Sequence, residues 1–120
     1  MRKLFSTTRA WRAAFVLALV PAMAGVAAAQ DAALIKKGES VYAAQKCSMC
    51  HAVAGKGSKA NPLDGVGAKL SAADIHEWIV SPAAATAKAK STKKPPMPAK
   101  YDKLPAADID AMVAYLASLK

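Results

Sequence analysis

The run CSMCH at residues 47–51 constrains this chain more than any other feature of its sequence. It holds the only two cysteines among 120 residues, three positions apart, and a histidine follows the second one directly. A zinc site would need two further cysteine or histidine ligands, and His76 is the only other candidate. A thioredoxin-like redox pair would need a strand-helix-strand unit, which no pattern in the sequence predicts. A disulfide is the usual use of two cysteines in an oxidising compartment, but here the spacing favours a different one.

Cysteines three positions apart on a helical turn face the same side. Both thiols can therefore add to the two vinyl groups along one edge of a haem, and the histidine that follows then lies under the ring. This spacing is the attachment signature of c-type haem. The sequence thus predicts one covalent haem c bound through Cys47 and Cys50, with His51 as an axial ligand of the iron.

The N-terminal segment has the three parts of an export signal. Residues 1–12 carry four basic and no acidic residues, residues 13–29 are uncharged, and Ala27 and Ala29 offer the small side chains that a signal peptidase reads. We expect cleavage before Gln30 by the general secretory route, because no adjacent arginines indicate a twin-arginine signal. An uncleaved membrane anchor is the alternative, but this apolar run is short and is broken by proline and glycine. The mature protein is then expected in the periplasm, without stable membrane insertion.

Cleavage divides the chain into a signal peptide, residues 1–29, and a single domain, residues 30–120. The formal charge of +9 falls to +5 when the four basic residues of the signal are removed. Nucleic acid is excluded as a partner, because export removes the chain from it and no aromatic residues interleave the basic run. The mature domain keeps few aromatic residues for a core, namely Tyr42, Trp78, Tyr101 and Tyr115. We therefore expect a cofactor to stabilise the centre of the fold.

The first and last parts of the domain predict helices. Asp31 is a suitable N-cap for a helix over about residues 32–46, and Gly38 in its interior favours close approach by another helix. A second helix follows Pro105 near the C-terminus. Its apolar residues recur at the helical spacing i, i+3, i+4, i+7, and they are Ile109, Met112, Val113, Leu116 and Leu119.

The middle of the domain combines a loop with short helices. Residues 52–69 hold four glycines and a proline without strand alternation or helical period, so they predict a loop. Ser71 and Asp74 form a capping-box pattern that opens a short helix. Pro82 ends this helix and is suited to begin another. No credible strand is found anywhere in the sequence.

In their order and spacing, these parts resemble class I c-type cytochromes, the small monohaem electron carriers of respiratory and related chains. The resemblance covers nearly all of residues 31–120. It implies an all-α, cytochrome c-like fold wrapped around one covalently bound haem, and a methionine late in the chain as the sixth iron ligand. It also implies that the first and last helices cross where Gly38 and Tyr115 meet. The parts that carry it are Gly38 and Tyr42, CSMCH, the loop NPLDGVGAKL, the helix SAADIHEWIVSP, the segment PPMP and the ending AYLASLK.

Met97 is the methionine best suited to be that ligand. Prolines at positions 95, 96 and 98 hold its backbone extended, so little conformational entropy is lost when the sulfur is presented to the iron. His76 is the rival ligand, but it projects about 100° from its apolar neighbour on a helix, which favours a solvated side chain. The other methionines leave with the signal, lie in the haem motif or belong to the last helix, and they are Met1, Met23, Met49 and Met112.

Three further residues are expected to contact the haem or its ligands. In the family, a proline carbonyl just before an L-x-G-x-x-G stretch accepts a hydrogen bond from the ligand histidine. Pro62 occupies this place, although the stretch LDGVG here is one residue shorter. Trp78 or Tyr101 is expected to donate to a haem propionate, with simple packing as the alternative for each.

Histidine and methionine on opposite faces of a haem leave no open coordination site, which describes an electron carrier and not an enzyme. A haem subunit bound permanently to a dehydrogenase or oxidase is the first alternative. A gas-binding or peroxidatic haem protein, which needs a labile iron site, is the second. A cluster of lysines is expected to surround the haem crevice and steer it toward acidic redox partners, with a solvated loop as the alternative for residues 88–94. The lysines are Lys46, Lys56, Lys59, Lys69, Lys88, Lys90, Lys93, Lys94 and Lys100.

Overall fold

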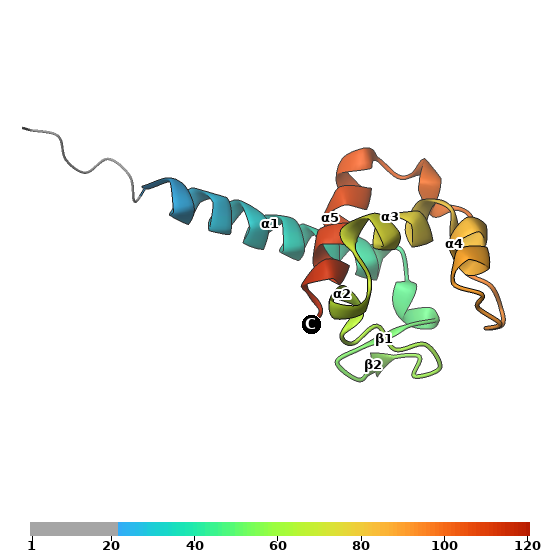
Figure 1. The fold of residues 1–120 in the computed structure, drawn as a ribbon. Helices are drawn as coiled ribbons and strands as arrows, with labels where there is room; N and C mark the ends of the chain where they lie inside the picture. The colour runs from blue at the N-terminus through green and yellow to red at the C-terminus, as the bar shows by residue number, and fades with distance from the viewer. Residues whose placement is uncertain (1–21) are drawn as a thin grey trace, which may run out of the picture.

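The computed structural model describes residues 22–120, and most of the predicted signal peptide lies outside them. Helices dominate this part of the chain and gather around the last helix (Figure 1). The elements in order are α1 (Ala22–Ala44), the 3-10 turn η1 (Cys47–Met49), strands β1 (Ala52–Val53) and β2 (Lys56–Gly57), α2 (Val66–Lys69), α3 (Ala72–Val80), α4 (Pro82–Lys88), the 3-10 turn η2 (Tyr101–Lys103) and α5 (Ala106–Ser118).

Helix α1 differs from its predicted bounds at both ends. It already includes Ala22, so Asp31 lies within the helix and not at its N-cap. The residues before Asp31 are mostly alanine, the strongest helix former, and they continue the helix past a residue that could have capped it. At the other end α1 stops at Ala44, because Lys46 takes a left-handed conformation with φ 56° and turns the chain into η1. Figure 1 shows the N-terminal part of α1 extending away from the other helices.

The predicted loop over residues 52–69 contains two small pieces of regular structure. Strands β1 and β2 pair antiparallel through a two-residue turn, in which Ala54 and Gly55 both have positive φ angles. This turn type matches the twist of a hairpin, and the Asp64 carboxylate accepts a 2.8 Å hydrogen bond from the Ala54 amide. The expectation of no strand is therefore wrong for residues 52–57. Strands of two residues are too short to produce the alternation that would predict them.

Helices α3 and α4 begin where the sequence predicts. The Ser71 hydroxyl accepts from the Asp74 amide, and the Asp74 carboxylate accepts in return from the Ser71 amide, which completes the capping box. Pro82 occupies the first turn of α4. The ammonium of Lys88 in α4 contacts the carboxylates of Asp74 and Glu77 in α3 at 2.7 and 3.1 Å, so an ion-pair network joins the two helices.

The last helix α5 crosses α1 at Gly38. A Cβ atom at this position would lie 2.6 Å from both the Ala111 carbonyl carbon and the Tyr115 Cβ, closer than atoms in contact can be. The Tyr42 ring packs edge-on against Tyr115, with ring centroids 5.7 Å apart. The predicted close approach at Gly38 is confirmed. Ile109, Met112 and Leu116 of the predicted stripe are buried, while Val113 and Leu119 are partly buried.

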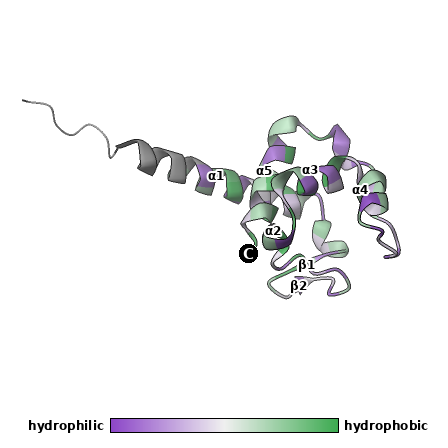
Figure 2. Ribbon diagram, in the orientation of Figure 1, coloured by the Kyte–Doolittle hydropathy of each residue, from purple (hydrophilic) through white to green (hydrophobic). Residues whose placement is uncertain are grey.

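Hydrophobic and hydrophilic residues alternate along α3 and α5 in Figure 2, as expected for helices that bury one face. Their buried residues form a single cluster with Tyr42 and Tyr101. Within residues 22–120, no helix combines the length and the apolar character that a membrane crossing requires.

Candidate functional site

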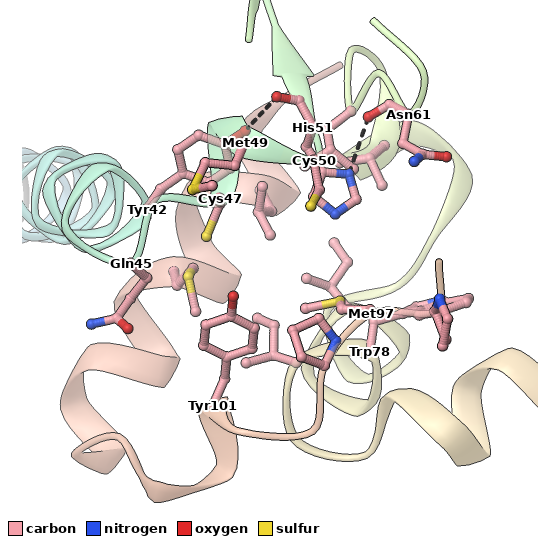
Figure 3. Close-up of a pocket in the computed structure, with 18 of the residues that line it drawn as sticks. Tyr42, Gln45, Cys47, Met49, Cys50, His51, Asn61, Trp78, Met97 and Tyr101 are labelled. Atoms are coloured by element: carbon pink, nitrogen blue, oxygen red, sulfur yellow. Dashed lines mark hydrogen bonds between the residues drawn. The ribbon is translucent and has the colours of Figure 1, made fainter. Parts of the chain in front are cut away.

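A cavity of about 660 Å³ lies between the CSMCH motif and the segment that carries Met97. Its walls come from all five helices, both 3-10 turns and the loops between them (Figure 3). Apolar side chains form much of its lining, among them Leu63, Leu70, Ile75, Ile79, Met112 and Leu116. Volume and lining are those of a site for a large, mostly apolar ligand.

The first wall of the cavity holds the motif itself. Cys47 begins η1, and its carbonyl accepts hydrogen bonds from the amides of Cys50 and His51 at 3.1 and 3.0 Å, which coils the motif into a tight turn. Both cysteines are free, and both line the cavity (Figure 3). Burial raises the pKa of the Cys47 thiol. Met49 also lines the cavity, and its side chain is 74% exposed.

The imidazole of His51 is held from behind by a backbone carbonyl. Its Nδ1 lies 3.0 Å from the carbonyl oxygen of Asn61, a distance at which Nδ1–H donates a hydrogen bond. With the proton on Nδ1, the other ring nitrogen keeps a free lone pair for a metal. Figure 3 shows the ring projecting into the cavity.

Pro62 was the predicted partner of this histidine, and that assignment is wrong by one residue. Ala52 bridges to Pro62 in parallel fashion, with the Ala52 amide donating to Asn61 and the Leu63 amide donating to Ala52. In a parallel bridge of this kind, the carbonyl of the residue before the bridged one and the amide of the residue after it face the partner segment. The carbonyl of the bridged residue itself, here Pro62, faces away. The shortened LDGVG stretch was the signal in the sequence that the register could differ. Pro62 still lines the cavity.

Met97 lies on the opposite wall of the cavity from His51. Figure 3 shows its sulfur and the His51 ring facing each other across the open space. The prolines at positions 95, 96 and 98 line the same wall, so the extended segment predicted from them carries Met97 to the cavity. Met112 lines the cavity from α5, where it is 2% exposed in the core.

Trp78 and Tyr101 also line the cavity. Tyr101 is buried, and burial raises the pKa of its phenol. Figure 3 shows its hydroxyl directed toward the cavity. His76 is exposed and is not among the lining residues, which agrees with the solvated side chain predicted for it.

The predicted lysine cluster divides into several groups. Lys46, Lys93 and Lys100 line the cavity. Lys88 instead faces two carboxylates of α3, so its charge is largely compensated locally. Among the lysines expected around the crevice, Lys88 thus pairs with α3 and is not one of the residues that line the cavity.

Sequence reasoning missed two groups at the site. The Asn61 carbonyl was overlooked because any residue type supplies a carbonyl. The Tyr42 hydroxyl was also overlooked; it lies 3.5 Å from the carbonyl oxygen of His51, and burial raises the pKa of this phenol to about 12. Tyr42 therefore presents a neutral hydroxyl to the motif.

The residues around the cavity fit the haem c predicted from the motif. Two free thiols at one edge can form the thioether links, and an imidazole with its Nδ1 already engaged can bind iron. The apolar lining suits a porphyrin, and three of the exposed lining residues, Lys46, Lys93 and Lys100, are cationic. Donor set and cavity are thus consistent with one haem held covalently through Cys47 and Cys50.

Comparison with known proteins gives an independent assignment. The family model described as Cytochrome c matches residues 35–120, from the middle of α1 to the C-terminus. No curated protein and no solved structure matches the chain significantly. The helical fold agrees with the all-α architecture of that family. This protein therefore belongs to the cytochrome c family, whose cofactor is covalently attached haem c.

Proposed function

We propose that this protein is a periplasmic carrier of single electrons, with one haem c whose iron is ligated by His51 and Met97. Members of the cytochrome c family act as haem-based electron carriers with redox partners. The observation that carries the finer assignment is the pair of side chains facing each other across the cavity, His51 from one wall and Met97 from the other (Figure 3).

When bound, the haem supplies an iron that changes its charge by one electron. The protein's own residues orient the iron ligands and set the relative stability of the two oxidation states. Asn61 orients the His51 ring, and the proline-rich segment presents the soft, neutral sulfur of Met97, which favours the reduced state. The apolar lining excludes water and disfavours an additional positive charge inside the cavity. The sulfur ligand and the apolar lining both raise the reduction potential.

The ligand assignment is tested with absorption spectra of the haem-loaded protein in both oxidation states. We expect the weak red band that sulfur bonded to ferric iron produces, and we expect Met97→Leu to abolish it while the haem stays attached. Met49→Leu is the matched control, because Met49 also lines the cavity but comes from the CSMCH motif, where it is 74% exposed, and not from the wall opposite His51. A red band that survives in Met97→Leu would refute the assignment.

Two alternative functions predict different results. A gas-binding or peroxidatic protein has a labile iron site, so its reduced form would bind carbon monoxide readily, whereas a carrier with firm Met97 ligation resists it. A fixed haem subunit would copurify with a dehydrogenase or oxidase in constant ratio. Rapid binding of carbon monoxide or a constant stoichiometric partner would replace the proposal of a diffusible carrier.

The proposed location and partners have their own tests. Mass spectrometry of the protein from the periplasmic fraction should show an N-terminus at residue 30 and one haem adduct on the motif. Lys46, Lys93 and Lys100 at the cavity favour an acidic docking surface on the redox partner. Electron transfer to such a partner should slow as ionic strength rises, and a flat rate would argue against electrostatic steering.

A further inference from the structure

One lysine joins the two loops that form the opposite walls of the cavity. Among the three lysines that line it, Lys100 lies over the Tyr101 ring, with its ammonium 5.3 Å from the ring centroid. Lys93 instead reaches across the opening, and its ammonium lies 3.2 Å from the carbonyl oxygen of Ala60. The two residues are 33 positions apart in the chain, so this hydrogen bond connects segments that share no local structure.

The Lys93 end of this hydrogen bond is anchored to α4. The Lys93 amide lies 3.4 Å from the Ser91 hydroxyl oxygen, and the Ser91 amide donates to the Thr86 carbonyl in α4 at 3.0 Å. Met97 follows four residues later along the same segment. Lys93 therefore belongs to a piece of backbone that is fixed at one side and leads to the proposed sulfur ligand at the other.

The Ala60 end lies one residue before the carbonyl that His51 contacts. Asn61, the next residue, provides the carbonyl that accepts from His51 Nδ1 and from the Ala52 amide. The Ala60 and Asn61 carbonyls belong to consecutive planar peptide groups that share the Asn61 Cα, so only the two backbone dihedrals of Asn61 separate them. The carbonyl that Lys93 binds and the carbonyl that orients the imidazole are thus neighbours in one short stretch, which the Ala52 amide also holds at Asn61.

We infer that Lys93 is a positioning residue, which ties the Met97 segment to the loop that orients His51 and so keeps the cavity closed. This inference rests on the His51 and Met97 ligation proposed above. Opening the cavity on the Met97 side requires the ammonium to leave Ala60. Loss of the hydrogen bond therefore increases the fraction of molecules in which the sulfur is withdrawn.

Lys93 donates to the neutral carbonyl of Ala60, so its proposed role depends on a hydrogen bond and not only on its positive charge. A lysine that acts only through its positive potential is equivalent to its exposed neighbour Lys94. Within residues 22–120, the Lys94 ammonium makes no hydrogen bond or ion pair. Lys94→Met is therefore the matched control for Lys93→Met, because both remove one charge and only the latter removes the bond. Lys93→Arg keeps a long cationic donor and should restore it.

The experiment titrates the oxidised, haem-loaded proteins with imidazole, which competes with Met97, and follows the loss of the red band. One hydrogen bond of this kind corresponds to about a threefold to tenfold change in an equilibrium constant. We expect Lys93→Met to bind imidazole about threefold to tenfold more tightly than wild type. Lys94→Met and Lys93→Arg should remain within about twofold of wild type. Equal imidazole affinities in Lys93→Met and Lys94→Met would overturn the inference.

Hydrogen exchange provides a second readout that does not depend on the iron ligand. Amides in residues 58–63 and 91–94 should exchange faster in Lys93→Met than in Lys94→Met, with no difference in α5. If wild type lacks the red band, the proposed ligation fails, and exchange alone decides whether Lys93 joins the two loops. Identical exchange in the two variants would overturn the inference in that case as well.

Discussion

Gly38→Ala tests whether the α1–α5 crossing is as close as the structure shows. The added Cβ would lie 2.6 Å from the Ala111 carbonyl carbon and from the Tyr115 Cβ. The Ala111 carbonyl oxygen would be nearer still. Ordinary contact begins near 3.4 Å, so the two helices would have to separate by more than about 0.8 Å. The first contact is backbone and cannot rotate away, so the cost of overpacking falls near the upper end of its usual range, about 3 kcal/mol.

Helix propensity acts in the opposite direction at this position. Replacing glycine by alanine within a helix stabilises it by about 1 kcal/mol, so the net loss in unfolding free energy is about 2 kcal/mol. With a urea m-value of about 1.5 kcal/mol per molar, the unfolding midpoint should fall by roughly 1.3 M. Far-ultraviolet circular dichroism of the haem-loaded protein during urea titration measures this shift.

Ser40→Ala is the control for this prediction. Ser40 is exposed on α1, and its hydroxyl only donates to the Lys36 carbonyl one turn before. Alanine at this position gains propensity without meeting α5, so the unfolding free energy should rise by no more than about 0.5 kcal/mol. A Gly38→Ala protein that is as stable as Ser40→Ala would refute the close crossing.

Two further predictions concern an ion pair and the histidine partner. The Lys88 ammonium holds the pKa of Asp74 at about 2, below its ordinary 3.8. Because the pKa is lower in the folded state, the ion pair stabilises the fold above pH 3.8, and this stabilisation is lost as the pH falls toward 2. The stability difference between wild type and Asp74→Asn should therefore be constant near neutral pH and should shrink between pH 3.8 and 2 in urea titrations; an unchanged difference at low pH would contradict the pairing. In the reduced, haem-loaded protein, an NMR coupling across the hydrogen bond should connect His51 Nδ1 to the carbonyl carbon of Asn61, because the oxygen of that carbonyl lies 3.0 Å from the nitrogen. A coupling to the carbonyl carbon of Pro62 instead would restore the role to residue 62.

Features encoded by neighbouring residues were predicted well. The capping box of Ser71 and Asp74, the helix start at Pro82 and the apolar stripe of α5 each depend on spacings of three or four residues. Such signals act within one or two helical turns, so they can be read without knowing what packs against them. Gly38 was also informative, because a glycine inside a helix is unfavourable unless another element needs the space.

Features that depend on contacts between distant segments were predicted poorly. The turn at Ala54 and Gly55 lacks the residues that usually mark a hairpin, and Asp64 helps to hold it from ten positions away. The N-terminal bound of α1 was placed at Asp31, because a strong capping residue is only a preference and the preceding alanines outweigh it. The Asn61 carbonyl was missed because backbone groups have no signature in the sequence.

By itself the sequence determined which atoms this protein offers to a cofactor: two thiols three positions apart, an adjacent imidazole and a thioether among prolines. Residue identity is enough for this, because it fixes chemistry and local backbone preference. Only the tertiary structure decided that Asn61 and not Pro62 holds the imidazole, that Met97 faces it across one cavity, and that Lys93 spans the opening. These are relations between segments far apart in the chain, and they depend on the register and packing of the whole fold.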